Sequence, residues 1–384
     1  MISRKLIIVG MVNSIHLARW IEKLHNYVKI KVFVFPTFPS DLHPLLKSIS
    51  SMNNKKSNIH ILTLLNNNKV NLYLQKILFF FFQNYFLLFW LRRYILCIRP
   101  DYIHSHELTT SSTLCLELKL DLQEKFPKWI VSNWGSDIFF FYKFLEKRRK
   151  LKQILKFSNF YSAECNRDYI LAKKIGTNAK FLKCVLNSGG VELKKIEKRR
   201  NNLTTSLRKI IIVKGYQGLI GMGILAIKAL NKISNKIKDY KIIIYSADQE
   251  VINYYSKIKN KSKLNICLYS QKKKLNENQM YNLFAKSRIY LGISKSDGVS
   301  TSFLEAMALG AFPIQSSTSC ANEWIKNNKS GFLVKNNISY ISKKILRAVI
   351  DDKLVDRASK INYYIIKNKA DSEKIKAIIR NFYK

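Results

Sequence analysis

The chain has 384 residues, a length that suits two domains, each with its own hydrophobic core. Its hydrophobic fraction of 47% excludes a disordered chain, and its formal net charge of +42 favours anionic partners such as phosphorylated substrates or acidic lipid surfaces. The basic residues are spread along the whole chain, and part of the excess of positive charge reflects a composition rich in Lys. Since no nucleic-acid motif is present, we expect no nucleic acid as a partner.

The first elements predict an α/β fold. Residues 6–10 (LIIVG) form an apolar run of strand type, residues 15–25 an amphipathic helix, and residues 29–35 (KIKVFVF) a second strand. This order is typical of a doubly wound parallel sheet, in which ligands bind beyond the carboxyl ends of the strands. We therefore expect Asn13 and His16 to lie at a cleft, where His16 either starts the helix or contacts a ligand.

An unusually aromatic segment follows at residues 77–91 (ILFFFFQNYFLLFWL). It is shorter than the ~20 apolar residues that span a bilayer. It is compatible with a buried helix, and equally with a helix in the plane of an anionic membrane surface that packs on one side and touches lipid on the other. The candidate membrane contacts are the aromatic and basic residues Phe79, Phe80, Phe82, Phe86, Trp90, Arg92 and Arg93.

Two further strand ends in the first half carry polar side chains. The stretch PDYIHSH ends at His106, and the strand WIVSNW ends at Trp134, three residues before Asp137. The carboxyl ends of parallel strands gather at one edge of the sheet, so both ends are expected at the cleft. A histidine at a strand end is as often structural as functional.

The second half begins after a polar, charged linker at residues 197–208. Residues 209–214 (KIIIVK) form a strand, and the loop at residues 215–223 (GYQGLIGMG) leads into a helix. The loop has the composition of a turn that cradles phosphate, although a glycine-rich loop is weak evidence by itself.

The most informative stretch runs from residue 294 to residue 334. After a strand at residues 288–293, a loop with Gly298 precedes a helix at residues 302–309, and Gly310 stands where a helix end favours the left-handed region. Ser300, Thr301 and Ser302 begin the helix, whose unpaired N–H groups attract anions. Asp297 and Glu305 flank this end and can accept hydrogen bonds from sugar hydroxyls, which predicts a nucleotide-sugar site. An ordinary capped helix with a solvated Glu305 is the alternative.

A family resemblance supports the first interpretation. Asp297 and Glu305 are separated by seven residues, and Ala-Met-Ala-Leu-Gly follows Glu305. This pattern resembles the donor-site signature of GT-B retaining glycosyltransferases of bacterial surface-polysaccharide biosynthesis (group 1, family-four type), although Glu is usual in the place of Asp297. The resemblance implies two Rossmann-like α/β domains that face each other across a cleft. It implies that Glu305 binds the nucleotide ribose and that Asp297 contacts the donor sugar as a catalytic residue. The other implied donor contacts are Lys214, Gly215, Gly298, Ser300, Thr301 and Ser302.

The resemblance is weaker in the first half. Trp134 stands where a histidine is usual, so we expect Asp137 and His106 to serve as catalytic contacts to the acceptor, with His16, Asn13 and Trp134 beside them. No D-x-D pair is present and the six cysteines show no C-x-x-C spacing, so no metal and no cofactor are expected. Lysines and loop amides would offset the charge of the leaving diphosphate instead.

These features predict four segments: an acceptor-binding domain at residues 1–196, the linker at 197–208, a nucleotide-sugar-binding domain at 209–362, and a final helix at 363–384 that crosses back to the first domain. The predicted activity is transfer of a hexose, with retention, from a nucleotide-diphosphate sugar to a lipid-linked saccharide acceptor of O-antigen, lipopolysaccharide or capsule assembly. Since the amino terminus lacks a signal-peptide core, we expect a cytoplasmic protein, peripheral at the inner face of the cytoplasmic membrane. The alternatives are a catalytically silent sugar-nucleotide-binding subunit, a GT-B sugar-nucleotide epimerase and a nucleic-acid-binding protein.

Overall fold

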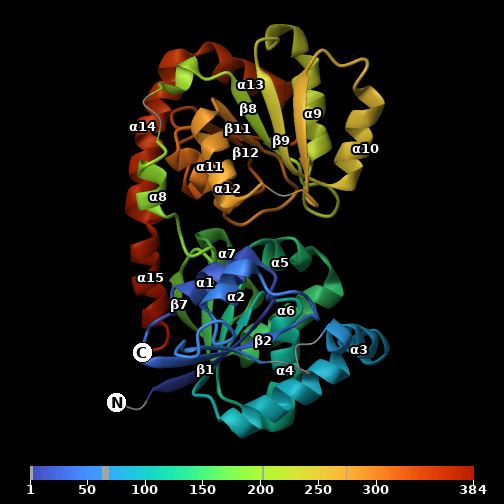
Figure 1. Cartoon of the computed structure of the whole chain (residues 1–384), viewed down its shortest axis with the longest axis vertical. Coiled ribbons are helices and arrows are strands. Elements are labelled where there is room, and N and C mark those ends of the chain that lie inside the picture. Colours follow the sequence, from blue (N-terminus) through green and yellow to red (C-terminus); the bar gives the residue numbers. More distant parts are fainter. Residues whose placement is uncertain (1–2, 63–68, 201–202, 274) are drawn as a thin grey trace. The chain divides into compact units, whose positions relative to one another are not determined.

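The computed structural model describes residues 3–62, 69–200, 203–273 and 275–384. The chain divides into two compact units, one formed by Met1–Gly189 with Ile375–Lys384 and the other by Gly190–Lys374. The boundary thus lies at Gly189 and Gly190, earlier than the expected position after residue 196. The returning segment begins at Ile375, within α15 (Ser372–Asn381), whereas α14 (Asp352–Lys369) stays in the second unit (Figure 1).

The first unit is built on a seven-stranded sheet in the order β3-β2-β1-β4-β5-β6-β7. Neighbouring strands are parallel throughout. The apolar runs seen in the sequence form buried strands here, because a parallel sheet is covered on both sides. The strands are β1 (Arg4–Gly10), β2 (Ile30–Pro36), β3 (Ile59–Ile61), β4 (Tyr102–His106), β5 (Lys128–Ser132), β6 (Phe160–Ala163) and β7 (Lys180–Cys184).

Helices pack around this sheet over a core that includes Trp129, Tyr161 and the inner side of the aromatic helix. The first helix starts as predicted, because the Ser14 hydroxyl accepts the backbone N–H of His16 at 3.2 Å. The helices are α1 (Ile15–Glu22), α2 (Pro44–Ile49), α3 (Lys69–Ile98), α4 (Ser111–Leu122), α5 (Ser136–Phe139), α6 (Leu145–Phe157) and α7 (Asn166–Ile175).

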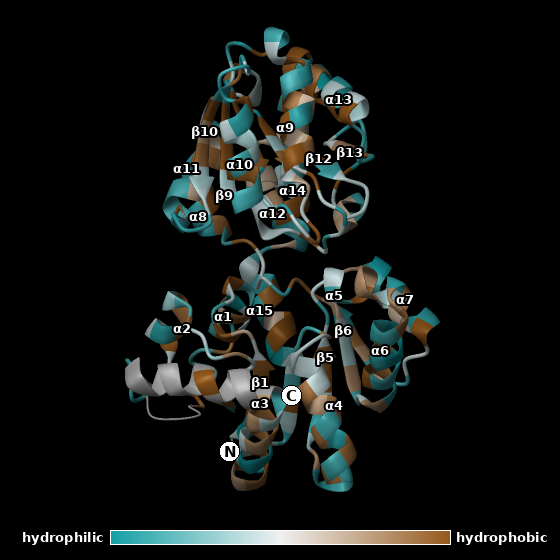
Figure 2. Ribbon diagram, turned by 90° about the vertical axis from the view of Figure 1, so that its right-hand side faces the viewer, coloured by the Kyte–Doolittle hydropathy of each residue, from teal (hydrophilic) through white to brown (hydrophobic). Residues whose placement is uncertain are grey.

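The second unit has a six-stranded parallel sheet in the order β10-β9-β8-β11-β12-β13. Its strands are largely brown in Figure 2, which colours hydrophobic residues so. Pro313 lies inside β12 and is paired in register with Tyr290. The strands are β8 (Ile210–Lys214), β9 (Lys241–Ala247), β10 (Asn265–Ser270), β11 (Ile289–Gly292), β12 (Phe312–Ser316) and β13 (Phe332–Val334).

The remaining helices of this unit include α12, which carries the predicted signature. Gly310 follows it with a φ of +91°, as the C-cap prediction required. The helices are α8 (Leu193–Glu197), α9 (Gly223–Lys232), α10 (Gln249–Ile258), α11 (Glu277–Lys286), α12 (Thr301–Ala308), α13 (Ile338–Ile350) and the α14 and α15 described above. The two sheets confirm the predicted fold class of two Rossmann-like α/β units.

The strand order determines where ligands can bind. In each sheet the order reverses beside the first strand, between β1 and β4 in one unit and between β8 and β11 in the other. A crevice opens at the carboxyl ends of the strands at such a reversal, because the two flanking loops leave in opposite directions. The loops after β8 and β11 are the glycine-rich loop and the Asp297 loop.

Candidate functional site

A lysine and an aspartate meet at the reversal point of the second unit. The Lys214 ammonium at the end of β8 lies 2.9 Å from the Asp297 carboxylate and 3.4 Å from the Ser300 hydroxyl. Both charged side chains are largely buried, with exposed fractions of 14% and 21%. The predicted donor contacts at the end of β8 and in the loop after β11 are therefore gathered around one largely buried cation.

The surroundings of Lys214 keep it charged. Burial alone would lower the pKa of its ammonium, but attraction to Asp297, with smaller contributions from Tyr290 and Tyr216, outweighs burial and raises the pKa above its usual value. The ammonium also lies over the ring of Tyr216, 4.8 Å from its centroid. Lys214 is thus a permanent positive charge in a site of low exposure.

The glycine-rich loop is pinned against the Asp297 loop. The Met222 N–H donates to the Ile293 carbonyl at 3.1 Å, and the Lys295 N–H donates to the Ile220 carbonyl at 2.7 Å. Gly215 is required at the start of this loop, because a Cβ there would lie 2.8 Å from the Cα of Ala247. The two loops therefore form one backbone-lined wall at the strand ends.

Helix α12 begins where the sequence indicated. Ser300 occupies the N-cap position, but its side chain makes no capping hydrogen bond, and the Thr301 hydroxyl is buried without a partner among the described residues. Gly298 is buried in the preceding loop, where its carbonyl accepts the N–H of Cys320 at 3.1 Å. Ser302 is half-buried at the helix start. The Thr301 hydroxyl is thus a polar group of the first turn that could bond a ligand.

Glu305 is buried, with 6% of its surface exposed, instead of solvated. Its carboxylate accepts a hydrogen bond from the Tyr281 hydroxyl at 3.3 Å. Burial of a carboxylate is costly unless it is hydrogen-bonded. This placement argues against the alternative of an ordinary exposed helix residue.

Several functional candidates were missed in the sequence. Lys295 follows β11, and its ammonium lies 3.3 Å from the Gly218 carbonyl, beside the glycine-rich loop. It is the candidate for the second cation that the sequence did not locate, and its position just after a strand could have indicated it. Tyr216 lies in the glycine-rich loop two residues after Lys214, so the local sequence could have indicated it. Tyr281 and Tyr290 lie near Glu305 and Lys214 only through the fold, so no local pattern marks them.

In the first unit, Asp137 is held by backbone donors. Its carboxylate accepts the Leu108 N–H at 2.9 Å and the Trp134 N–H at 2.8 Å. Burial raises the pKa of Asp137 to about 7; the two N–H groups work against this shift and nearby Glu107 adds to it. Asp137 therefore joins the loops after β4 and β5 and titrates near neutrality.

Two of the three other predicted acceptor residues are brought together. The rings of His16 and Trp134 lie 5.6 Å apart, and Asn13 is exposed on the turn before α1. The indole N–H of Trp134 is buried without a partner among the described residues. Their role in binding an acceptor stays a prediction.

His106 does not project into an open cleft. Its ring is fully buried, and its centroid lies 4.8 Å from that of the Trp20 ring and 4.2 Å from that of the His104 ring. Burial lowers the pKa of His106 to about 3, so the ring is neutral. We expected this strand-end side chain at the cleft, but it lies beneath α1, because the ring of Trp20 in that helix packs over it.

Helix α3 has one packed side and one exposed side. Leu87, Leu91 and Ile95 lie in the core, and Phe86 and Trp90 pack against it, so these last two are not the free membrane contacts that we expected. The exposed side chains recur at helical spacing, which explains the difference. The side chains of Phe79 and Phe80 lie outside the described part of the structure. The exposed stripe consists of Phe82, Tyr85, Phe89, Arg92, Arg93 and Leu96.

Within the described ranges, no helix combines the length and the apolarity that crossing a membrane would need. The Arg92 guanidinium lies 2.9 Å from the Asp121 carboxylate, although both groups are more than half exposed.

Comparison with solved structures finds the same fold over the full length. An Anabaena HepE protein in complex with UDP and glucose has a TM-score of 0.69 at 13% identity, covering 99% of each chain. A glycosyltransferase from Rickettsia africae has a TM-score of 0.68 at 17% identity, covering 100% of this chain and 98% of its own. A UDP-N-acetylglucosamine 2-epimerase has a TM-score of 0.63 at 15% identity, covering 99% of this chain and 96% of its own.

Comparison with curated protein sequences finds no match. Two protein families do match. Residues 195–367 match the family "Glycosyl transferases group 1", and residues 5–165 match the family "Glycosyl transferase 4-like". The two matches cover most of both units, and together with the two Rossmann-like sheets they assign the chain to the glycosyltransferases of GT-B fold.

Proposed function

We propose that this glycosyltransferase moves a hexose, with retention of configuration, from a nucleotide-diphosphate sugar to a lipid-linked saccharide. The observation that carries the donor half of the proposal is the cluster of Lys214, Asp297 and Ser300 at the strand reversal of the second unit. Charged Lys214 and the backbone N–H groups that begin α12 suit a diphosphate. The buried Glu305 carboxylate, already bonded to Tyr281, suits the ribose hydroxyls.

The same cluster suggests how the leaving group is stabilised. Negative charge develops on the diphosphate as the sugar departs, and a preorganised cation in a site of low exposure lowers the energy of that state. We propose that Lys214 exchanges part of its bond to Asp297 for the diphosphate, which frees Asp297 for the donor sugar. Donor phosphate oxygens would help to accept the proton of the incoming hydroxyl. No divalent cation is needed in this scheme, so excess EDTA should leave the rate unchanged.

The acceptor half rests on the first unit. The exposed aromatic and basic stripe of α3 supports contact with an anionic membrane surface at the inner face of the cytoplasmic membrane, because aromatic rings enter the interfacial region and arginines attract acidic headgroups. A lipid-linked glycan, as in O-antigen or capsule assembly, would then be presented to this unit. Binding to acidic vesicles but not to neutral ones, and its loss in a Phe82→Ser, Phe89→Ser variant, tests this step.

The activity is tested with isotopically labelled nucleotide sugars and a membrane extract that contains lipid-linked saccharides. We expect label to enter the lipid fraction with the anomeric configuration of the donor, and a Glu305→Gln variant to transfer far less. Formation of an epimeric sugar nucleotide from donor alone would instead favour the epimerase, whose fold is shared. Donor binding without turnover would favour a catalytically silent subunit. Binding of DNA without binding of nucleotides would favour a nucleic-acid-binding protein.

A further inference from the structure

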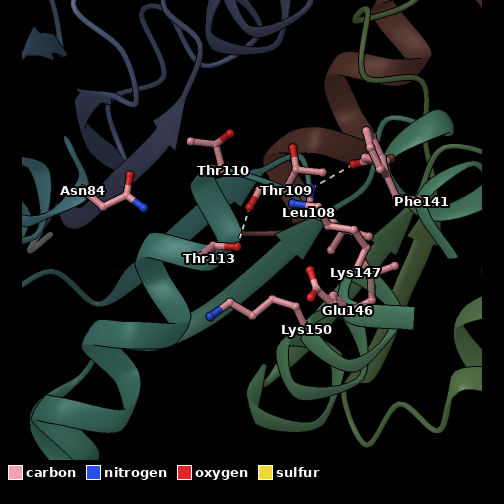
Figure 3. Close-up of a pocket in the computed structure, with 11 residues that line it drawn as sticks. Asn84, Leu108, Thr109, Thr110, Thr113, Phe141, Glu146, Lys147 and Lys150 are labelled. Atoms are coloured by element: carbon pink, nitrogen blue, oxygen red, sulfur yellow. Dashed lines mark hydrogen bonds between the residues drawn. The ribbon is translucent and has the colours of Figure 1, made fainter. Parts of the chain in front are cut away.

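The first unit contains a pocket of about 430 Å³ whose lining includes Asp137 but none of the other predicted site residues. It lies between the start of α4, the side of α6 and residue Asn84 of α3, as Figure 3 shows. Its volume is within the usual range for a small-molecule site. Each lining residue belongs to the first unit.

One wall of the pocket is rich in groups that bond sugar hydroxyls. Thr109, Thr110 and Thr113 line it from the start of α4, and Asp137 lines it from the start of α5. Glu107 fixes this wall, because its carboxylate accepts the N–H groups of Thr109 and Thr110 at 2.7 Å each. Threonine hydroxyls can both donate and accept hydrogen bonds. With its pKa of about 7, Asp137 can do either near neutral pH.

The opposite wall is basic. Lys147 and Lys150 line the pocket from α6, together with Glu146. Helix α6 (LEKRRKLKQILKF) contains six cations and one acid. Lys150 is paired with Glu117 at 3.6 Å, but both side chains are more than one third exposed, so this ion pair is weak and can open. An anionic group is therefore favoured at this wall.

The pocket lining also includes one neighbour of the membrane stripe and one bonding partner of the acceptor residues. Asn84 precedes Tyr85, the most exposed aromatic residue of the α3 stripe, with 81% of its surface in solvent. Asp137, on the opposite side, bonds the backbone of Trp134. A ligand in this pocket thus lies between the lipid-facing helix and the residues expected to contact the acceptor.

We propose that this pocket binds a sugar carrying an anionic group, either phosphate or carboxylate, as part of the acceptor. The threonines and Asp137 hold its hydroxyls, and Lys147 and Lys150 hold its charge. This inference rests on the proposed function, since it names the chemical class of the acceptor.

Ligand-observed NMR titrations of the full chain test whether this pocket binds an anionic sugar. Saturating UDP is present to keep the probes out of the donor site. The probes are glucose 1-phosphate, glucuronic acid, glucose and inorganic phosphate. We expect the two anionic sugars to bind at least about tenfold more tightly than glucose, because a bond to a charged group contributes more than a neutral one. Preference for glucose 1-phosphate would point to a phosphate-linked sugar, and preference for glucuronic acid to a uronate.

A pair of matched variants locates the binding. Lys147→Gln with Lys150→Gln should remove the preference for anionic sugars. Lys152→Gln with Lys156→Gln removes the same charge from exposed positions of α6 outside the pocket lining and should leave the preference intact. Thr110→Val, at an exposed position, should weaken the binding of glucose and of the anionic sugars alike. Equal losses in both lysine variants, or equal binding of glucose and the anionic sugars, would overturn the proposal.

Failure here is distinguishable from failure of the proposed function. Binding of UDP is measured separately and depends on the second unit alone. If UDP binds but no anionic sugar does, only the pocket assignment is wrong. If UDP fails to bind, the donor site itself is wrong, whichever sugars bind the first unit.

Discussion

Replacing Lys214 with Gln tests the electrostatics of the donor site. The substitution removes the charge that lies 2.9 Å from Asp297 and 3.4 Å from Ser300, while a side chain of similar length remains. Because Lys214 has only 14% of its side chain exposed, water cannot fully replace it. We therefore expect the variant to bind nucleotide diphosphates more weakly.

The size of the effect follows from the type of bond lost. A hydrogen bond to a charged group contributes about 1.5–3 kcal/mol, which corresponds to about 10- to 150-fold in dissociation constant. The lower end applies if Lys295, beside the glycine-rich loop, takes over part of the charge. The loss should shrink at high salt less than a surface interaction would, since the site is largely buried.

Isothermal titration with UDP measures this change directly. Lys241→Gln is the matched control, because Lys241 is an exposed lysine at the opposite end of the neighbouring strand β9. Its affinity should remain that of the wild type. If both variants bind UDP as the wild type does while remaining folded by circular dichroism, the assignment of Lys214 to the diphosphate is refuted.

Three further predictions concern Glu305, Gly215 and Asp137. Glu305→Gln should bind UDP more weakly while its binding of free pyrophosphate is unchanged, because only the ribose contact is altered; an equal loss for both ligands would contradict this. Gly215→Ala places a Cβ 2.8 Å from Ala247 Cα, so it should lower the free energy of unfolding by about 1–3 kcal/mol. The melting temperature should fall by about 2–4 °C for each kcal/mol lost, and an unchanged melting temperature would contradict the close approach. Burial raises the pKa of Asp137 to about 7, so the native state binds this proton more tightly than the unfolded chain does. The wild type should therefore lose stability relative to Asp137→Asn as pH rises from about 4 to about 7. Parallel pH profiles of stability for the two proteins would contradict this prediction.

The strand pattern of the sequence was sufficient for the fold. Apolar runs such as residues 6–10 and 209–214 are strands near the predicted positions, because a strand covered on both sides must be apolar along its whole length. The unit boundary was placed too late. Helix α8 (Leu193–Glu197) begins within residues 190–196 and runs up to the linker, and only long-range contacts assign these residues to the second unit.

The donor cluster was partly predictable. Asp297, Ser300 and Glu305 lie within one local motif, whereas Lys214 joins them because β8 and β11 are neighbours in the sheet. The buried tyrosines around them, Tyr281 among them, come from other elements and leave no trace in the local sequence.

The first unit was harder to predict at the level of side chains. Spacing from a strand end predicted the position of His106 but not its burial, which depends on the ring of Trp20 packing over it. Likewise, composition marked the aromatic segment but not which rings point outward. Tyr85 and Phe89 are exposed, while Phe86 and Trp90 pack inward.

The central claim, that the second unit binds a nucleotide sugar, is tested most directly by thermal unfolding of the wild type with a panel of nucleotide-diphosphate sugars. At a free concentration of about 100 times the dissociation constant, a true donor should stabilise the chain by about 2.7 kcal/mol. We predict that one or two members of the panel raise the melting temperature and that Glu305→Gln loses the effect. If no nucleotide or nucleotide sugar stabilises the wild-type chain, the account of the donor site is contradicted.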